Sequence, residues 1–158
     1  MEVMKRIRTR ILAEWDHLTV TTAVHFSEVD SMKIVWHGHY LRYAEAAREV
    51  YCAARGMSYQ QMEDVGSVAP VVRCQLEFFH PARMGRTVTV TVAHLPDSEP
   101  KLDLLYEIRD ADGTLLCVVE TVQVFVDLQS VPFLTSPPPV ERFFAAIRFR
   151  EAVGRPPA

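Results

Sequence analysis

Asp30 and His37 are the two residues of this chain whose types and spacing best fit a hydrolytic site. Asp30 lies in a loop-forming segment seven residues before His37, and a helix-forming run opens directly after His37. The first turn of a helix carries backbone N–H groups without intrahelical partners and partial positive charge, so it can stabilise a developing oxyanion. A carboxylate that faces such a helix end can act as a nucleophile or as a general base.

Asp30 also has a structural alternative, because aspartate is common in turns, where its carboxylate accepts hydrogen bonds from nearby backbone N–H groups. The spacing alone leaves both interpretations open. Glu45 and Arg48 lie three positions apart in the helix-forming run and are expected to form a surface ion pair.

The chain's composition excludes several classes of function. It has 158 residues, a net charge of −3, 49% hydrophobic and 23% charged residues, which fit a single globular domain without a basic nucleic-acid-binding surface. No apolar run approaches the ~20 residues that span a bilayer, and the basic N-terminus lacks the apolar segment of a signal peptide. We therefore expect a cytoplasmic protein that binds neither nucleic acid nor membrane.

The three cysteines predict neither a metal site nor a disulfide framework. Cys52, Cys74 and Cys117 are widely spaced, form no Cys-x-x-Cys pair and have apolar neighbours in the sequence. We interpret all three as reduced residues of the hydrophobic core, and we expect no metal and no cofactor.

Hydrophobic periodicity predicts the elements that must position Asp30 and His37. Residues 19–27 alternate as a half-buried strand that leads into the Asp30 loop. From 39 to 55 the period becomes helical, with a stripe that contains two tyrosines and three alanines, and Gly56 is a natural stop. Small residues on that stripe allow close approach to a sheet, and residues 58–65 predict one further short helical turn.

The second half of the chain is predicted to be mostly strands. Alternating or apolar segments cover 68–79, 87–95, 102–108 and 114–127, and Asp112-Gly113 is a strong hairpin signal. Residues 140–149 predict a short C-terminal helix whose apolar stripe is Phe143, Phe144 and Ile147, followed by a disordered tail at 154–158. We divide the chain into an N-terminal extension at 1–17, a domain at 18–136, and a C-terminal helix and tail at 137–158.

This order predicts an α+β domain with an antiparallel sheet and one long helix against it. One helix covers one face of the sheet, and the remaining apolar residues need a partner. We therefore expect a homodimer, or a dimer of dimers.

The segments 26–30 and 34–48, together with 71–85, 106–110 and 121–127, resemble the hotdog-fold thioesterases of the 4-hydroxybenzoyl-CoA thioesterase type. The resemblance covers about residues 18–127. It implies a five-stranded antiparallel sheet wrapped around one long central helix, and hydrolysis of an acyl thioester carried by CoA or by an acyl carrier protein. Segments 35–40, 59–62, 101–110 and 133–138 are similar to a subgroup from aryl-polyene and related polyketide or fatty-acid-like pathways.

The resemblance also implies roles for individual residues. Asp30 would act on the thioester carbonyl, and His37 would contribute chiefly its backbone N–H, aimed at the thioester oxygen. Glu45 is a weaker candidate for a catalytic carboxylate, because another branch of hotdog thioesterases has its acid on this helix. Further substrate contacts would come from Trp36, Gly38 and Tyr40, although tyrosine at such a position is more often a packing residue.

Two other features of the resemblance concern charged residues. Arg83 and Arg86 flank a turn and could bind the phosphates of CoA or phosphopantetheine, although solvated turn residues are the simpler alternative. Lys33 departs from the family pattern, which often has glycine in the turn after the aspartate. Lysine there is strained if the turn requires a positive φ, and it places a cation near the predicted site.

Two alternative functions remain compatible with this fold. A hydroxyacyl dehydratase would pair a histidine with a distant acidic residue in a segment that contains proline and glycine, and no such segment is evident. A non-enzymatic module would hold an acyl thioester without cleaving it.

Overall fold

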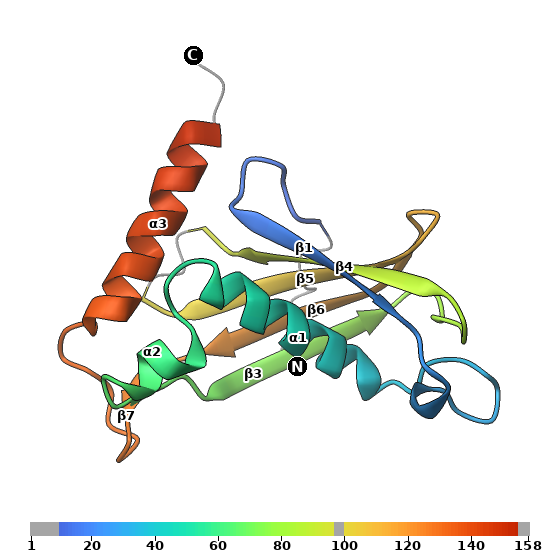
Figure 1. Ribbon diagram of the computed structural model, residues 1–158, viewed down its shortest axis with the longest axis horizontal. Coiled ribbons are helices and arrows are strands. Elements are labelled where there is room, and N and C mark those ends of the chain that lie inside the picture. Colours follow the sequence, from blue (N-terminus) through green and yellow to red (C-terminus); the bar gives the residue numbers. More distant parts are fainter. Residues whose placement is uncertain (1–9, 97–99, 155–158) are drawn as a thin grey trace, which may run out of the picture.

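The computed structural model describes residues 10–96 and 100–154. Its main feature is a five-stranded antiparallel sheet, with the long helix on one side of it (Figure 1). The five-stranded sheet has the order β1-β4-β5-β6-β3. Its strands are, in chain order, β1 (His17–Ala23), β3 (Val71–Phe78), β4 (Thr87–His94), β5 (Leu102–Asp110) and β6 (Leu115–Gln123). The two short strands β2 (Ser67–Val68) and β7 (Val126–Asp127) form a separate pair.

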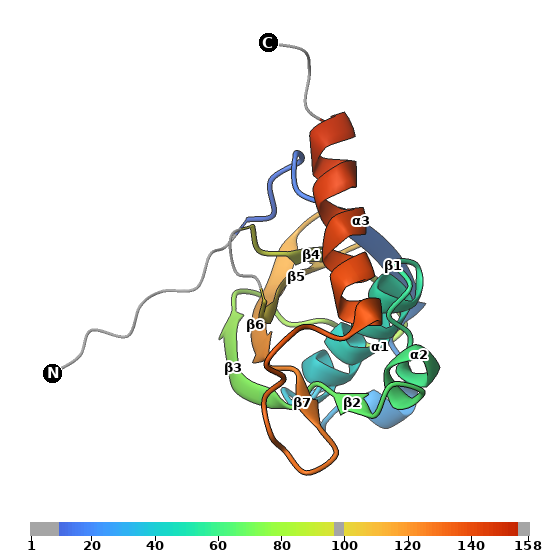
Figure 2. The same cartoon turned by 90° about the vertical axis from the view of Figure 1, so that its left-hand side faces the viewer.

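The long helix α1 (His39–Ala53) crosses the concave side of the sheet and packs on β4 and β1 (Figures 1 and 2). Ala44 and Ala47 are completely buried there, and the absence of larger side chains lets the helix axis approach the strands. Gly56 follows α1 with a φ of 75°, and the Met57 N–H returns to the Cys52 carbonyl, which ends the helix as expected. The predicted sheet wrapped around one central helix is confirmed.

The C-terminal helix α3 (Pro138–Gly154) is longer than the predicted 140–149 and stands at one end of the sheet (Figure 1). Its first half packs into the main core through Phe143, Phe144 and Ile147, as the apolar stripe predicted. The sequence predicts a disordered tail at 154–158. Residues 155–158 lie outside the described part of the chain. A short helix, α2 (Tyr59–Glu63), occupies the predicted turn at 58–65.

The N-terminal segment is tied to the same core. Asp16 forms a buried ion pair with Arg55 just beyond α1. Ile11 and Trp15 pack on the convex face of the sheet against a small buried cluster that includes Leu105. Among the described residues, Ile11 and Trp15 of the N-terminal segment and the apolar stripe of α3 therefore pack on the same sheet as residues 18–136.

Two sequence-based expectations need correction. The first strand ends at Ala23 rather than at 27, because its partner β4 begins at Thr87, opposite Ala23. The chain then forms a 3-10 turn, η1 (Phe26–Glu28), in which Phe26 is exposed. Cys52 and Cys117 are buried as expected, whereas Cys74 is exposed on β3, an edge strand.

Candidate active site

Asp30 begins a tight hairpin that returns at Ile34. The Asp30 N–H donates to the Ile34 carbonyl at 2.9 Å, and the Lys33 N–H donates to the Asp30 carbonyl at 2.9 Å. Lys33 has a left-handed φ of 59°, the conformation that closes a three-residue hairpin loop and favours glycine. The turn therefore requires the positive φ that makes lysine strained at this position.

The carboxylate of Asp30 has one turn contact and one free oxygen. Oδ1 accepts a hydrogen bond from the Met32 N–H at 2.8 Å, which is the structural role considered for this residue. Within the described residues, Oδ2 has no hydrogen-bond partner, and Asp30 forms no ion pair. The structural role therefore leaves one oxygen for a ligand.

A cavity of about 440 Å³ brings Asp30, His37 and Tyr40 together. Its other walls come from the hairpin, the end of β3 and the loop that follows β3. They are formed by Met32, Ile34, Val35, Phe78, Phe79, His80 and Pro81. The volume lies in the range of small-molecule sites, which run from ~300 to ~1,000 Å³.

The segment that enters α1 presents free backbone donors beside this cavity. Among the described residues, the N–H groups of His37 and Gly38 have no hydrogen-bond partner, while the His39 N–H donates to the Trp36 carbonyl at 2.9 Å. Gly38 is the N-cap of α1 and supplies no side-chain cap. These donors at the helix start are what an oxyanion requires.

Tyr40 is buried in the first turn of α1 and lines the cavity with its ring. Its oxygen accepts a hydrogen bond from the Ala82 N–H at 2.9 Å, and its ring meets Phe78 edge-on at 5.3 Å. Burial is the main cause that raises the pKa of Tyr40, so its hydroxyl stays protonated at neutral pH and can donate to a ligand.

The remaining predicted site residues do not line this cavity. The ring of Trp36 is half exposed and lies 4.5 Å from the ring of His37. Arg83 pairs through its backbone with Ile34 of the Asp30 hairpin, and Arg86 directly precedes β4. Both arginines are exposed, so their predicted phosphate contacts would form outside the cavity.

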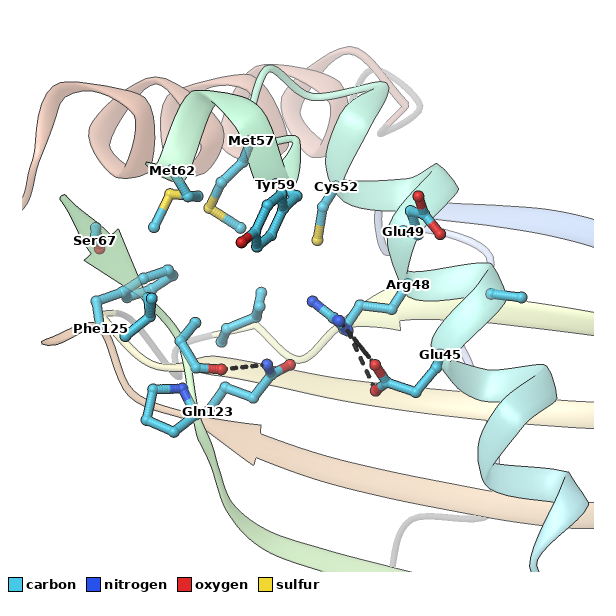
Figure 3. A pocket seen from close by; sticks show the side chains of 15 residues that line it. Glu45, Arg48, Glu49, Cys52, Met57, Tyr59, Met62, Ser67, Gln123 and Phe125 are labelled. Atoms are coloured by element: carbon cyan, nitrogen blue, oxygen red, sulfur yellow. Dashed lines mark hydrogen bonds and ion pairs between the residues drawn. The ribbon is translucent and has the colours of Figure 1, made fainter. Parts of the chain in front are cut away.

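A second, larger cavity of about 670 Å³ opens farther along α1 (Figure 3). Its wall is largely apolar and includes Met57, Met62, Leu102 and Phe125. Glu45 and Arg48 border it and form the expected ion pair at 2.8 Å. Their partly exposed pairing gives no support for Glu45 as a catalytic carboxylate.

The sequence did not predict this second cavity. Its residues come from 45–70, which include parts of α1, α2 and β2, and from the ends of β5 and β6 together with Phe125, which lie far away along the chain. A methionine or phenylalanine that lines a cavity has the same local pattern as one that fills the core. No signal in the sequence distinguishes the two.

Within residues 10–96 and 100–154, no group of three or more histidine, cysteine, aspartate or glutamate side chains is arranged to hold a metal ion. No helix in that part of the chain combines the length and apolar character needed to cross a bilayer.

Comparison with known proteins places the chain in a family. The sequence model of the Thioesterase-like superfamily matches residues 24–151, and the chain belongs to this superfamily. The predicted class, a hotdog-fold thioester hydrolase, is thereby confirmed, whereas membership of the 4-hydroxybenzoyl-CoA or polyketide subgroup is not.

Two relatives and one solved structure of the same fold illustrate the likeness. YneP of Bacillus subtilis, named as a candidate acyl-CoA thioesterase, is 28% identical over 129 residues, which cover 82% of this chain and 84% of YneP. A 1,4-dihydroxy-2-naphthoyl-CoA hydrolase of Thermosynechococcus vestitus is 25% identical over 69% of this chain and 77% of its own. A Staphylococcus aureus protein solved in complex with CoA has a TM-score of 0.78 at 16% identity, covering 94% of this chain and 92% of that protein.

Proposed function

We propose that this protein hydrolyses acyl-CoA thioesters, with Asp30 as the catalytic carboxylate and the N–H groups of His37 and Gly38 as oxyanion donors. The observation that carries the proposal is the shared cavity, into which both Asp30 and His37 extend at the start of α1. The names of the relatives support CoA as the carrier. One well-placed oxyanion donor lowers a barrier of this kind by about 3 kcal/mol.

Two chemical routes use the free Oδ2 of Asp30. As a nucleophile, Oδ2 adds to the thioester carbon, the C–S bond breaks to release the CoA thiolate, and water then hydrolyses the acyl–aspartyl anhydride. As a general base, Asp30 takes a proton from water, which adds to the same carbon before the thiolate leaves and is protonated. Both routes give a free acid and a free thiol.

A single turnover in H₂¹⁸O distinguishes these routes. When water adds to the Asp30 carbonyl of the anhydride, the first equivalent of product acid carries no ¹⁸O and the protein gains the label, so ¹⁸O in Asp30 identifies the anhydride route. By general-base catalysis, the product acid carries ¹⁸O in the first turnover. Mass spectrometry of the acid and of the peptide that contains Asp30 measures both.

The main test is the Asp30→Asn variant, assayed by thiol release from a panel of acyl-CoAs. Asparagine keeps an oxygen for the Met32 N–H, so the turn is preserved while the charge is lost. We expect kcat/KM to fall about 10³-fold, equivalent to about 4 kcal/mol. Asp112→Asn is the matched control, because Asp112 accepts the Thr114 N–H at 3.0 Å in the same kind of turn on an exposed hairpin.

Two results would overturn the proposal. One is full turnover by Asp30→Asn. The other is tight binding of acyl-CoA by the wild-type protein without release of thiol, which would instead identify a non-hydrolytic acyl-binding module.

The second cavity is proposed to hold the part of the acyl group beyond the carbonyl. Cys52, which lines this cavity, follows Tyr40 of the first cavity by about 18 Å along α1, at ~1.5 Å per residue. Val68→Phe, which adds bulk to the wall, should lower kcat/KM for long acyl chains several-fold and leave acetyl-CoA unaffected. An equal effect on all chain lengths would contradict this placement.

The carrier and the pathway form the finer part of the proposal. Release of a polyketide-like or fatty-acid-like product from an acyl carrier protein is supported only by the motif resemblance. Comparing kcat/KM for the same acyl group on CoA and on an acyl carrier protein tests it, and Arg83→Ala should raise KM for either phosphate-bearing carrier.

We propose that the protein forms a homodimer through an edge of its sheet. Within the described residues, β3 has a strand partner on one side only, and Val71, Val72 and Phe78 are exposed along it. An exposed apolar edge of this kind favours pairing with a second copy. Sedimentation should show a dimer or tetramer, which Val72→Glu should convert to monomer.

A further inference from the structure

Glu28 lies at the base of the Asp30 hairpin and is bonded to three separate segments. Its Oε2 accepts the Tyr43 O–H at 2.6 Å and the His25 N–H at 2.8 Å. Its backbone carbonyl accepts the Trp36 N–H at 2.9 Å. Tyr43 belongs to α1, His25 to the turn before the hairpin, and Trp36 to the chain that leaves it, so this one residue joins all three.

A second tyrosine of α1 closes this network from the other side. The Val35 N–H donates to the Ala82 carbonyl at 2.9 Å, and the Ala82 N–H donates to the Tyr40 oxygen at 2.9 Å. The rings of Tyr40 and Tyr43 meet edge-on at 6.2 Å on the buried face of α1. The hairpin is thus attached to the helix at two neighbouring points.

Asp30 itself has no side-chain contact that reaches α1. Its carboxylate bonds only to the Met32 N–H, inside its own hairpin, within the described residues. The position of Asp30 relative to the helix start must therefore be set by how the whole hairpin is attached. In catalysis, a displacement of ~1 Å at the reacting group can cost about 10²-fold in rate.

We infer that Glu28 is a positioning residue that, through Tyr43, holds the Asp30 hairpin at the start of α1. Its effect on turnover rests on the proposed function, whereas its effect on the hairpin does not. Glu28 is not itself a candidate base, because its Oε2 already accepts two hydrogen bonds and its side chain does not line the cavity.

The charge of Glu28 strengthens this attachment. Burial acts to raise the pKa of Glu28, but the hydrogen bonds from Tyr43 and the His25 N–H outweigh it, and the net pKa is lowered. The side chain is therefore ionised at neutral pH, and a hydroxyl that donates to a carboxylate forms a stronger bond than one between neutral groups.

The kinetic test compares Glu28→Ala, Tyr43→Phe and the double variant. Each single change should lower kcat about 10- to 100-fold and change KM less than about threefold, because the substrate surface is intact while Asp30 is misplaced. The double variant should be no worse than Glu28→Ala alone, since both changes remove the same bond. Glu28→Gln, which keeps an acceptor oxygen for Tyr43, should retain most of the activity.

A second measurement is independent of any substrate. Hydrogen exchange of the Asp30, Lys33 and Trp36 amides should accelerate at least tenfold in Glu28→Ala and Tyr43→Phe, while amides of β5 stay protected. Glu63→Ala, at an exposed carboxylate of α2, and Tyr106→Phe, at a buried hydroxyl of the sheet, are the matched controls and should leave this exchange unchanged.

The outcomes separate the two proposals. Unchanged exchange in both variants, or unchanged kcat in an active enzyme, overturns the positioning role of Glu28. A wild-type protein that turns over no thioester, with the exchange effect present, overturns the proposed function and leaves the attachment of the hairpin supported.

Discussion

Gly38 lies against the indole of Trp36 so closely that a Cβ at residue 38 would stand 2.0 Å from Cζ3 of that ring. The backbone of Gly38 is helical, with φ −68° and ψ −23°, so its conformation does not require glycine. The close approach of the Trp36 ring is what requires glycine at position 38. The indole also lies 4.5 Å from the ring of His37 and meets the ring of His39 edge-on at 5.7 Å, so the Trp36 ring contacts both histidines that flank Gly38.

Gly38→Ala should displace the Trp36 ring, because the new Cβ overlaps it while half of the ring is free to move into solvent. We expect a shifted Trp36 emission and about tenfold lower turnover. Fluorescence is measured in a Trp15→Phe background, which leaves Trp36 as the single indole. In a Trp36→Ala background the added methyl should have little effect on turnover; an equal loss there would contradict the role of the ring contact.

Lys33→Gly should stabilise the protein by about 1 kcal/mol. A non-glycine residue in the left-handed region costs of order 1–3 kcal/mol, of which the greater freedom of glycine in the unfolded chain offsets a part. Urea unfolding measures the change. Ser130→Gly, at φ 65° in a loop distant in sequence, should give a similar gain. Lys33→Ala should give none, because it removes the charge and keeps the strain.

Glu28 should make stability depend on pH in the acid range. Its folded pKa is lowered from 4.5, so its contribution is present above about pH 4.5 and is lost as the pH falls through the folded pKa. The wild type should therefore lose more unfolding free energy than Glu28→Gln between about pH 6 and pH 3. His25, His39 and Tyr43, which face Glu28, are common to both proteins. Parallel pH profiles would contradict this expectation.

Asp16→Ala should destabilise the fold by about 3–5 kcal/mol, because it leaves the guanidinium of Arg55 buried without its counter-ion. Arg55 donates to Asp16 Oδ1 at 2.9 Å and lies 3.7 Å from the ring centre of Tyr51. Glu45→Ala, which breaks the partly exposed pair with Arg48, should cost less than about 1 kcal/mol. Similar losses of unfolding free energy in the two variants, measured by urea unfolding, would contradict the larger contribution expected of the buried Asp16–Arg55 pair.

The candidate site was predictable in part. The spacing of Asp30 and His37 around a helix start indicated a carboxylate near free N–H groups, and the structure brings both residues to one cavity. The roles of all the predicted site residues, those of Asp30 and His37 included, stay predictions. Glu28 was not singled out, because its partner Tyr43 lies 15 positions away and nothing in the local pattern of either residue indicates the bond.

By itself, the sequence determined the helix that follows His37, its end before Gly56, the succession of antiparallel strands and the Asp112-Gly113 turn. These features depend on local periodicity and on backbone preferences, which a few neighbouring residues express. Only the tertiary structure decided where the first strand ends, that Cys74 is exposed, how the two cavities lie along α1, and how Tyr40 and Tyr43 hold the Asp30 hairpin. Each of these depends on contacts between segments far apart in the chain, and such contacts leave no periodic trace in either segment alone.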